Sequence, residues 1–159
     1  MNSPPGNPPD VRAMLQRVSR ASVTVDGQPI ASIGPGLVVL LGVGHGDDEP
    51  TTDALARRIT ELRIFRDDDL RTNRSIIDTG GAALVVSQFT LYADTSRGRR
   101  PGFTNAADPT VAERLYLRLA ERLRAGGVTD VQTGSFGAEM AVELVNDGPF
   151  TIWLDTDRP

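Results

Sequence analysis

The chain has 159 residues, 39% hydrophobic and 24% charged, which suits one soluble domain with a hydrophobic core and leaves no apolar run of membrane-spanning length. Because it has no cysteine and one histidine, it lacks a thiol nucleophile, a disulfide framework and a thiolate zinc site, and it fits a reducing cytoplasm. The net charge of −4 argues against wrapping long nucleic acid, but not against touching one end of an RNA.

The first segment, MNSPPGNPPD, is rich in proline, glycine and asparagine. Such a composition cannot bury enough apolar surface to fold, so we expect residues 1–10 to be a disordered extension. The pattern from residue 11 to residue 159 contains no linker or repeat and predicts a single domain.

Two strand patterns follow. The segment from Met14 to Gly34 predicts a β-hairpin, because it is rich in valine and carries the two-residue turn signal Asp26-Gly27. The next segment, GLVVLLGVG, is continuously apolar, which predicts a central strand buried on both faces.

Two helices are predicted by apolar spacing. The first covers EPTTDALARRITELRIF, with Thr51, Thr52 or Asp53 as its N-cap. The second starts at Asp108-Pro109 and ends at Gly126-Gly127, because glycine disfavours continuation of a helix.

The remaining segments complete the fold prediction. The turn-rich segment 66–81 is expected to hold a short strand at 75–77, followed by the apolar strand AALVV. The last segment, from residue 128, suggests two strands broken at NDGP. The order predicts an α+β fold: one compact domain with a mostly antiparallel or mixed, barrel-like sheet and two main helices.

Polar side chains end the strand AALVV. Ser87, Gln88 and Thr90 surround Phe89, and buried hydroxyls and amides are costly unless they bond something. They either cap the sheet or line a site. Thr90 or Ser87 could act as a nucleophile, but a hydroxyl needs a base and no histidine is near in sequence. Catalysis by backbone N–H groups that bind a developing oxyanion demands fewer specialised side chains than a hydroxyl nucleophile with its base.

The segment NDGPFT interrupts the final strand. Pro149 cannot donate to a β-ladder, so Gly148-Pro149 indicates an edge, a bulge or a turn. An ordinary type II turn explains it, and so does a cis peptide that aims two carbonyl oxygens at one ammonium group.

Other polar clusters have simpler explanations than a site. The run His45 to Glu49 and the run Arg66 to Asp69 contain possible metal ligands, but both lie in turn-rich sequence, so we expect surface turns and no metal. The loop SRGRRPGF concentrates Arg97, Arg99 and Arg100, which are either solvated or in contact with phosphates.

Taken together, these motifs closely resemble the D-aminoacyl-tRNA deacylase (D-tyrosyl-tRNA deacylase) family, from Val11 to Leu154. The resemblance rests on RAMLQRVSRASVTVDG, GLVVLLGVG, VVSQFTLYAD, RGRRPGF and FGAEMAVELVNDGPFT. Two departures are the ten residues before Val11, where the family usually starts with methionine, and Phe150, where the family more often has valine.

The resemblance implies hydrolysis of the ester between a D-amino acid, or glycine, and the 3′-terminal adenosine of tRNA. It implies a cytoplasmic homodimer that proofreads chirality in translation, without cofactor, membrane or DNA. The residues Ser87, Gln88, Phe89 and Thr90 would line the catalytic wall, while Gly148 and Pro149 of the partner subunit, held by Arg17, would exclude L-amino acids. The residues expected to contact tRNA are Arg97, Arg99, Arg100, Phe136 and Met140.

Two alternatives stay open at this point. One is an esterase or amidase that uses Thr90 as a nucleophile on small activated esters. The other is a non-catalytic tRNA-binding editing module. Sequence does not decide between Thr90 and the tRNA 2′-hydroxyl, and it does not rank the D-amino acids.

Overall fold

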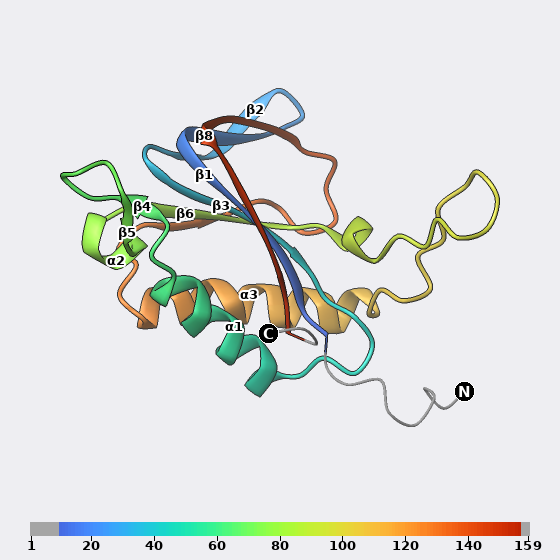
Figure 1. Cartoon of the computed structure of the whole chain (residues 1–159). Coiled ribbons are helices and arrows are strands. Elements are labelled where there is room, and N and C mark those ends of the chain that lie inside the picture. Colours follow the sequence, from blue (N-terminus) through green and yellow to red (C-terminus); the bar gives the residue numbers. More distant parts are fainter. Residues whose placement is uncertain (1–9, 157–159) are drawn as a thin grey trace.

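A mixed sheet with strand order β2-β1-β3-β6-β7 forms the centre of the molecule, and β8 pairs with β1 (Figure 1). The computed structural model describes residues 10–156, so the prediction for the N-terminal extension falls outside the described residues except at Asp10. The strands of this sheet are β1 (Arg12–Val25), β2 (Gln28–Ile33), β3 (Gly36–Gly42), β6 (Ala82–Ser87), β7 (Val131–Thr133) and β8 (Ala141–Asp155).

The sheet curls into a nearly closed barrel, which confirms the predicted fold class. Strand β1 pairs antiparallel with β2, β3 and β8, whereas β3–β6 and β6–β7 are parallel. At the open seam the main-chain N–H of Ser32 in β2 donates to the side-chain oxygen of Gln132 in β7 at 2.8 Å. The barrel interior is filled by small and branched apolar side chains: Val18, Ala21, Val23, Ala31, Ile33, Val38, Ala82, Leu84 and Val86.

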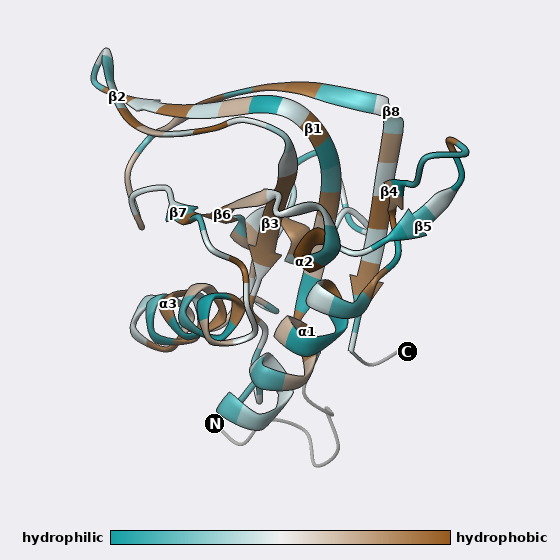
Figure 2. Ribbon diagram, turned by 90° about the vertical axis from the view of Figure 1, so that its left-hand side faces the viewer, coloured by the Kyte–Doolittle hydropathy of each residue, from teal (hydrophilic) through white to brown (hydrophobic). Residues whose placement is uncertain are grey.

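Two long helices cover one outer face of the sheet (Figures 1 and 2). Helices α1 (Glu49–Glu61) and α3 (Pro109–Ala125) bury apolar stripes at helical spacing, as predicted. Hydropathy colouring shows apolar stretches in β3 and β6 and mixed faces on the helices. This second core layer includes Leu15, Val39, Leu55, Ile59, Val85, Leu115, Leu119 and Leu123.

The starts of the two long helices differ in part from the prediction. The N-cap of α1 is Asp48, whose side chain accepts from the N–H of Thr51, so the three predicted caps lie inside the helix. Pro50 explains the earlier start, because its fixed φ suits the first turn. The N-cap position of α3 is Asp108 as predicted, although its side chain accepts no capping hydrogen bond.

The predicted strand at 75–77 is wrong. Ser75 instead caps the short helix α2 (Ile76–Thr79) in a capping box with Asp78, which outweighs the β-preference of the isoleucines. The strand lies just before it, where β5 (Thr72–Arg74) pairs with β4 (Phe65–Arg66).

Candidate active site

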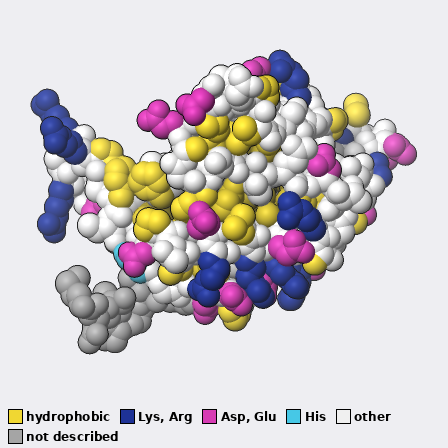
Figure 3. Space-filling view, turned by 180° about the vertical axis from the view of Figure 1, so that it is seen from behind, with side chains coloured by type: hydrophobic (Ala, Val, Ile, Leu, Met, Phe, Trp, Pro, Cys, Tyr) yellow, Lys and Arg dark blue, Asp and Glu magenta, His cyan; other side chains and the backbone are white. Residues whose placement is uncertain are grey.

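A cleft of about 670 Å³ opens beside the C-terminal end of β6. Its lining is largely apolar and comes from the end of β6, the loop before α3, the first turn of α3 and the segment before β8. On this face hydrophobic side chains gather beside a projecting loop (Figure 3). The lining residues are Val86, Ser87, Gln88, Phe89, Phe103, Ala106, Ala107, Pro109, Ala112, Phe136, Gly137, Ala138, Glu139, Met140 and Val142.

The tip of β6 presents two free main-chain donors. Pairing with β3 ends where Ser87 faces Leu41, and the N–H of Gln88 donates to the Leu41 carbonyl at 2.7 Å. The chain then enters a 3-10 turn (Phe89–Tyr92) that has no side-chain cap. The first N–H groups of a helical turn have no partner within it, so those of Phe89 and Thr90 are left unpaired among residues 10–156.

The side chains of the tip are arranged without a general base. The amide of Gln88 donates to the hydroxyl of Thr90, which lies next to the cleft and is not part of its lining. Among the described residues that line the cleft, Glu139 alone has a titratable side chain. A hydroxyl placed in this way lacks the paired base that nucleophilic catalysis requires.

Aromatic side chains form the walls of the cleft. Phe89 and Phe103 meet edge to face with ring centres 5.0 Å apart, and Phe136 packs against the buried Tyr116 with ring centres 5.9 Å apart. Phe136 and Met140, which we expected to contact tRNA, are thus brought together with the β6 tip. Phe103 was not predicted as a site residue, and its place after the arginine loop was the only signal.

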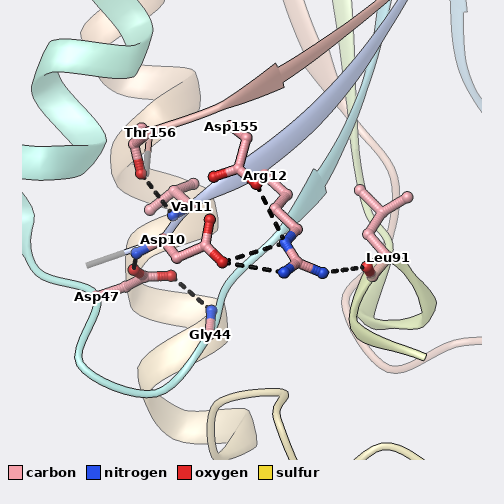
Figure 4. A network of polar contacts seen from close by, with 8 residues as sticks. All are labelled: Asp10, Val11, Arg12, Gly44, Asp47, Leu91, Asp155 and Thr156. Atoms are coloured by element: carbon pink, nitrogen blue, oxygen red, sulfur yellow. Dashed lines mark hydrogen bonds and ion pairs between the residues drawn. The ribbon is translucent and has the colours of Figure 1, made fainter. Parts of the chain in front are cut away.

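Arg12, at the start of β1, contacts the 3-10 turn. Its guanidinium donates to the Leu91 carbonyl at 2.9 Å and lies 4.3 Å from the centre of the Tyr92 ring. Two carboxylates, Asp10 and Asp155, pair with the same guanidinium (Figure 4). The start of β1 therefore supports the segment that follows the β6 tip.

The polar side chains of the Gly-rich turn after β3 have structural partners. Asp47 is buried and accepts from the N–H groups of Asp10 and Gly44 (Figure 4), Asp48 caps α1, and the His45 ring lies 2.6 Å from the Thr104 carbonyl oxygen. Burial raises the pKa of Asp47 to about 6. The expectation of a surface turn holds for His45, but the burial of Asp47 was missed.

A second cluster surrounds Gly148-Pro149, whose peptide bond is cis. Strand β8 runs on through this pair, so the predicted break at NDGP is wrong; the two strands of this segment, β7 and β8, are separated before Ala141. The register shifts instead: Gln16 pairs with Thr151 and Val18 with Asn146, which leaves residues 147–150 opposite Arg17 alone. The result is a wide bulge with Gly148 and Pro149 exposed at its tip.

Arg17 fills the space behind this bulge. It is 4% exposed, and its guanidinium donates to the carbonyls of Ile64 at 2.8 Å and Asp147 at 3.0 Å. Burial lowers the pKa of Arg17. The structure therefore brings Arg17 to the Gly148-Pro149 segment, while neither Gly148 nor Pro149 lines the cleft of its own chain.

The loop with Arg97, Arg99 and Arg100 projects from the domain next to the cleft (Figures 1 and 3). A bridge between Asp94 and Gly102 closes its base, and the three arginines are exposed.

Across residues 10–156 we find no helix that meets the length and apolarity of a membrane span.

Known proteins share this sequence and architecture. The family model described as D-Tyr-tRNA(Tyr) deacylase matches residues 14–155. D-aminoacyl-tRNA deacylases from Paracoccus denitrificans and Thermomicrobium roseum are each 59% identical over 146 residues, which is 92% of this chain and 97% and 94% of those proteins.

Solved structures agree on the fold. The c-Myc DNA unwinding element binding protein superimposes with a TM-score of 0.85 at 40% identity, over 90% of this chain and 97% of that one. A probable eukaryotic D-amino acid tRNA deacylase superimposes with a TM-score of 0.80 at 18% identity, over 92% and 99%, which supports the fold alone.

Proposed function

We propose that a second copy of the chain completes the active site of this protein, which belongs to the D-Tyr-tRNA(Tyr) deacylase family. The chain is a D-aminoacyl-tRNA deacylase, which is a hydrolase. In this proposal Gly148 and Pro149 of one copy enter the cleft of the other. The observation that carries it is their position: both are exposed at the tip of a braced bulge, yet they are absent from the lining of their own cleft.

The exposed strand β8 supports self-association. Within residues 10–156, β8 pairs with β1 and with no other strand. The exposed side chains Val142, Val145 and Trp153 lie along it, with 37%, 40% and 46% of their surface accessible. Exposed apolar groups on a strand with a free edge favour association with another chain.

Selection by handedness follows from two fixed points. In the proposed complex, main-chain carbonyls of the Gly-Pro segment hold the α-ammonium and the β6 tip holds the ester carbonyl. The Cα then has two remaining directions, of which one leads to solvent and the other into the Gly-Pro backbone. Because enantiomers carry the same groups, rejecting the L form needs a clash. Many D-amino acids and glycine would be accepted.

The chemistry needs modest assistance. An aminoacyl ester is an activated bond, and the unpaired N–H groups of Phe89 and Thr90 would stabilise the oxyanion that forms when water attacks. The ribose 2′-hydroxyl next to the ester would assist that water. The exposed Arg97, Arg99 and Arg100 would meet tRNA phosphates, and the enzyme would act in the cytoplasm.

Subunit mixing tests the proposal. A side chain at Gly148, where φ is +144°, would lie 2.9 Å from the Phe150 nitrogen, so Gly148→Ala distorts the filter. Ala138→Trp fills the cleft. We expect each variant alone to lose selective cleavage of D-tyrosyl-tRNA over L-tyrosyl-tRNA, and mixed dimers to regain one intact site. Monomers in solution, or no recovery on mixing, would contradict a shared site.

A small D-tyrosine ester separates the enzyme from a general esterase. We expect efficient cleavage of D-tyrosyl-tRNA and little cleavage of the free ester, because the terminal adenosine contributes binding energy. Equal rates on both would favour the esterase alternative, and no cleavage of either would favour a binding module.

A further inference from the structure

The Gly148-Pro149 bulge is held by a second charged contact besides Arg17. The side chain of Arg66 in β4 donates to the Asp147 carboxylate at 2.8 Å. The same carboxylate lies 3.5 Å from the Nε atom of Arg17. Arg66 thus reaches the bulge from β4, outside the two strands that form it.

Two sets of contacts restrain the bulge. The first joins its two ends: the Asn146 amide donates to the Phe150 carbonyl at 2.9 Å, and the Asn146 side-chain oxygen accepts from the Phe150 N–H at 3.1 Å. The second holds Asp147, whose carbonyl is bound by Arg17 and whose carboxylate is bound by Arg66. Arg17 therefore holds the main chain of Asp147, and Arg66 makes the shorter contact with its side chain.

We propose that the Arg66–Asp147 ion pair positions the Gly148-Pro149 backbone and thereby sets the stringency of chiral selection. This inference rests on the proposed function, since it assumes that Gly148-Pro149 is the filter. In the proposed complex both are positioning residues, because the Gly148-Pro149 backbone contacts the substrate and the ion pair acts through that backbone. A filter that works by steric exclusion is sensitive to small displacements, so loosening one anchor admits more L-substrate.

The pair is partly exposed, with 40% of the Arg66 side chain and 39% of the Asp147 side chain accessible. Exposed pairs are weak, so we expect the ratio of kcat/KM for D-tyrosyl-tRNA over L-tyrosyl-tRNA to fall about two- to fivefold in Asp147→Asn and Arg66→Gln. Arg66→Lys keeps the charge and should stay closer to the parent protein. The double variant Arg66→Gln/Asp147→Asn should be no worse than the worse single variant, because both remove one interaction.

A matched control lies on β1 and β8, the two strands that form the bulge. Arg20 in β1 and Glu143 in β8 form an ion pair at 3.1 Å, away from the bulge. Arg20→Gln removes it and should leave the selectivity ratio unchanged. A role confined to stability would change unfolding midpoints, or lower both rates equally, without moving the ratio.

The experiment separates this inference from the proposed function by including Gly148→Ala. If Gly148→Ala lowers the ratio while Asp147→Asn and Arg66→Gln do not, the positioning role is wrong and the filter stands. If Gly148→Ala also leaves the ratio intact, the filter itself is wrong. Independent, additive losses from Arg66→Gln and Asp147→Asn would likewise overturn the pairing.

Discussion

The guanidinium carbon of Arg17 lies 4.5 Å from the centre of the Phe150 ring. A buried cation over an aromatic face is attracted by the negative face of the ring. The two residues flank the Gly148-Pro149 segment, since Arg17 also binds the Asp147 carbonyl. Phe150 therefore contributes an additional contact to the group that braces the bulge.

Arg17 should not tolerate replacement by lysine. Lysine keeps the charge, but it lacks the planar fork that reaches both the Ile64 and Asp147 carbonyls. We expect Arg17→Lys to lower the free energy of unfolding by about 1–3 kcal/mol, measured by urea denaturation, and to raise cleavage of L-tyrosyl-tRNA. Arg20→Lys, at an exposed position of the same strand, is the control. Parent-like stability and selectivity in Arg17→Lys would contradict its bracing role.

Thr90→Ala should retain most activity. Its hydroxyl is bonded to the Gln88 amide, and no base among residues 10–156 is paired with it, so the proposed main-chain oxyanion donors survive the change. We expect kcat for D-tyrosyl-tRNA to fall less than about tenfold, whereas loss of a true nucleophile costs several orders of magnitude. Rapid-quench detection of an acyl group on Thr90 would refute this mechanism.

Gly36→Ala should strongly destabilise the sheet. A Cβ at this position would lie 1.8 Å from the Ala82 carbonyl oxygen, where β3 and β6 begin their parallel pairing. We expect a loss of about 3 kcal/mol or more, because the backbone of β6 would have to move. Gly34→Ala, where a Cβ meets nothing within 4 Å, should be nearly neutral. Similar thermal midpoints for the two variants would disprove the close approach.

Stability should fall as pH rises from about 4 to about 6. Burial raises the pKa of Asp47 to about 6, and burial followed by the neighbouring Asp155 raises that of Asp10 to about 6, from 3.8 in each case. Between these values the folded state holds more protons than the unfolded state, so deprotonation favours unfolding. Asp47→Asn should flatten this slope, which reduces the change in the free energy of unfolding between about pH 4 and pH 6 by up to about 2 kcal/mol.

Urea unfolding at pH 4.5, 5.5 and 7 measures that slope. Asp26→Asn makes the same charge change in the exposed hairpin turn and should leave the slope as it is. The slope, and not absolute stability, is the readout, because an asparagine side chain would also lose one of the two N–H contacts that Asp47 accepts. An unaltered slope in Asp47→Asn would show that this carboxyl does not titrate in that range.

Arg99→Glu should weaken tRNA binding. If the projecting loop meets phosphates, losing one contact lowers affinity and makes log Kd less dependent on log salt, by somewhat less than one unit of slope. Arg57→Glu makes the same charge change on α1 and should have a smaller effect. Filter binding from low to moderate salt measures both variants, and equal behaviour would show that the loop is only solvated.

Local chemistry determined much of this protein from its sequence. Asp26-Gly27 dictates the hairpin, glycine and proline bound α3, and the apolar run before Ser87 indicates a buried strand with a polar tip. Such signals act within a few residues, through φ/ψ preference and side-chain spacing. The same local reading failed where two local signals competed, as at Ser75, where a capping box outweighed β-branched residues.

Tertiary structure alone decided how distant segments meet. That residues 147–150 lie opposite Arg17 depends on the register of β8 on β1, which is set by packing along the whole strand. The pairing of Arg66 with Asp147 and the joining of Phe103 and Phe136 to the β6 tip depend on where α1 and α3 dock. These contacts link residues far apart in the chain, and no local preference encodes them.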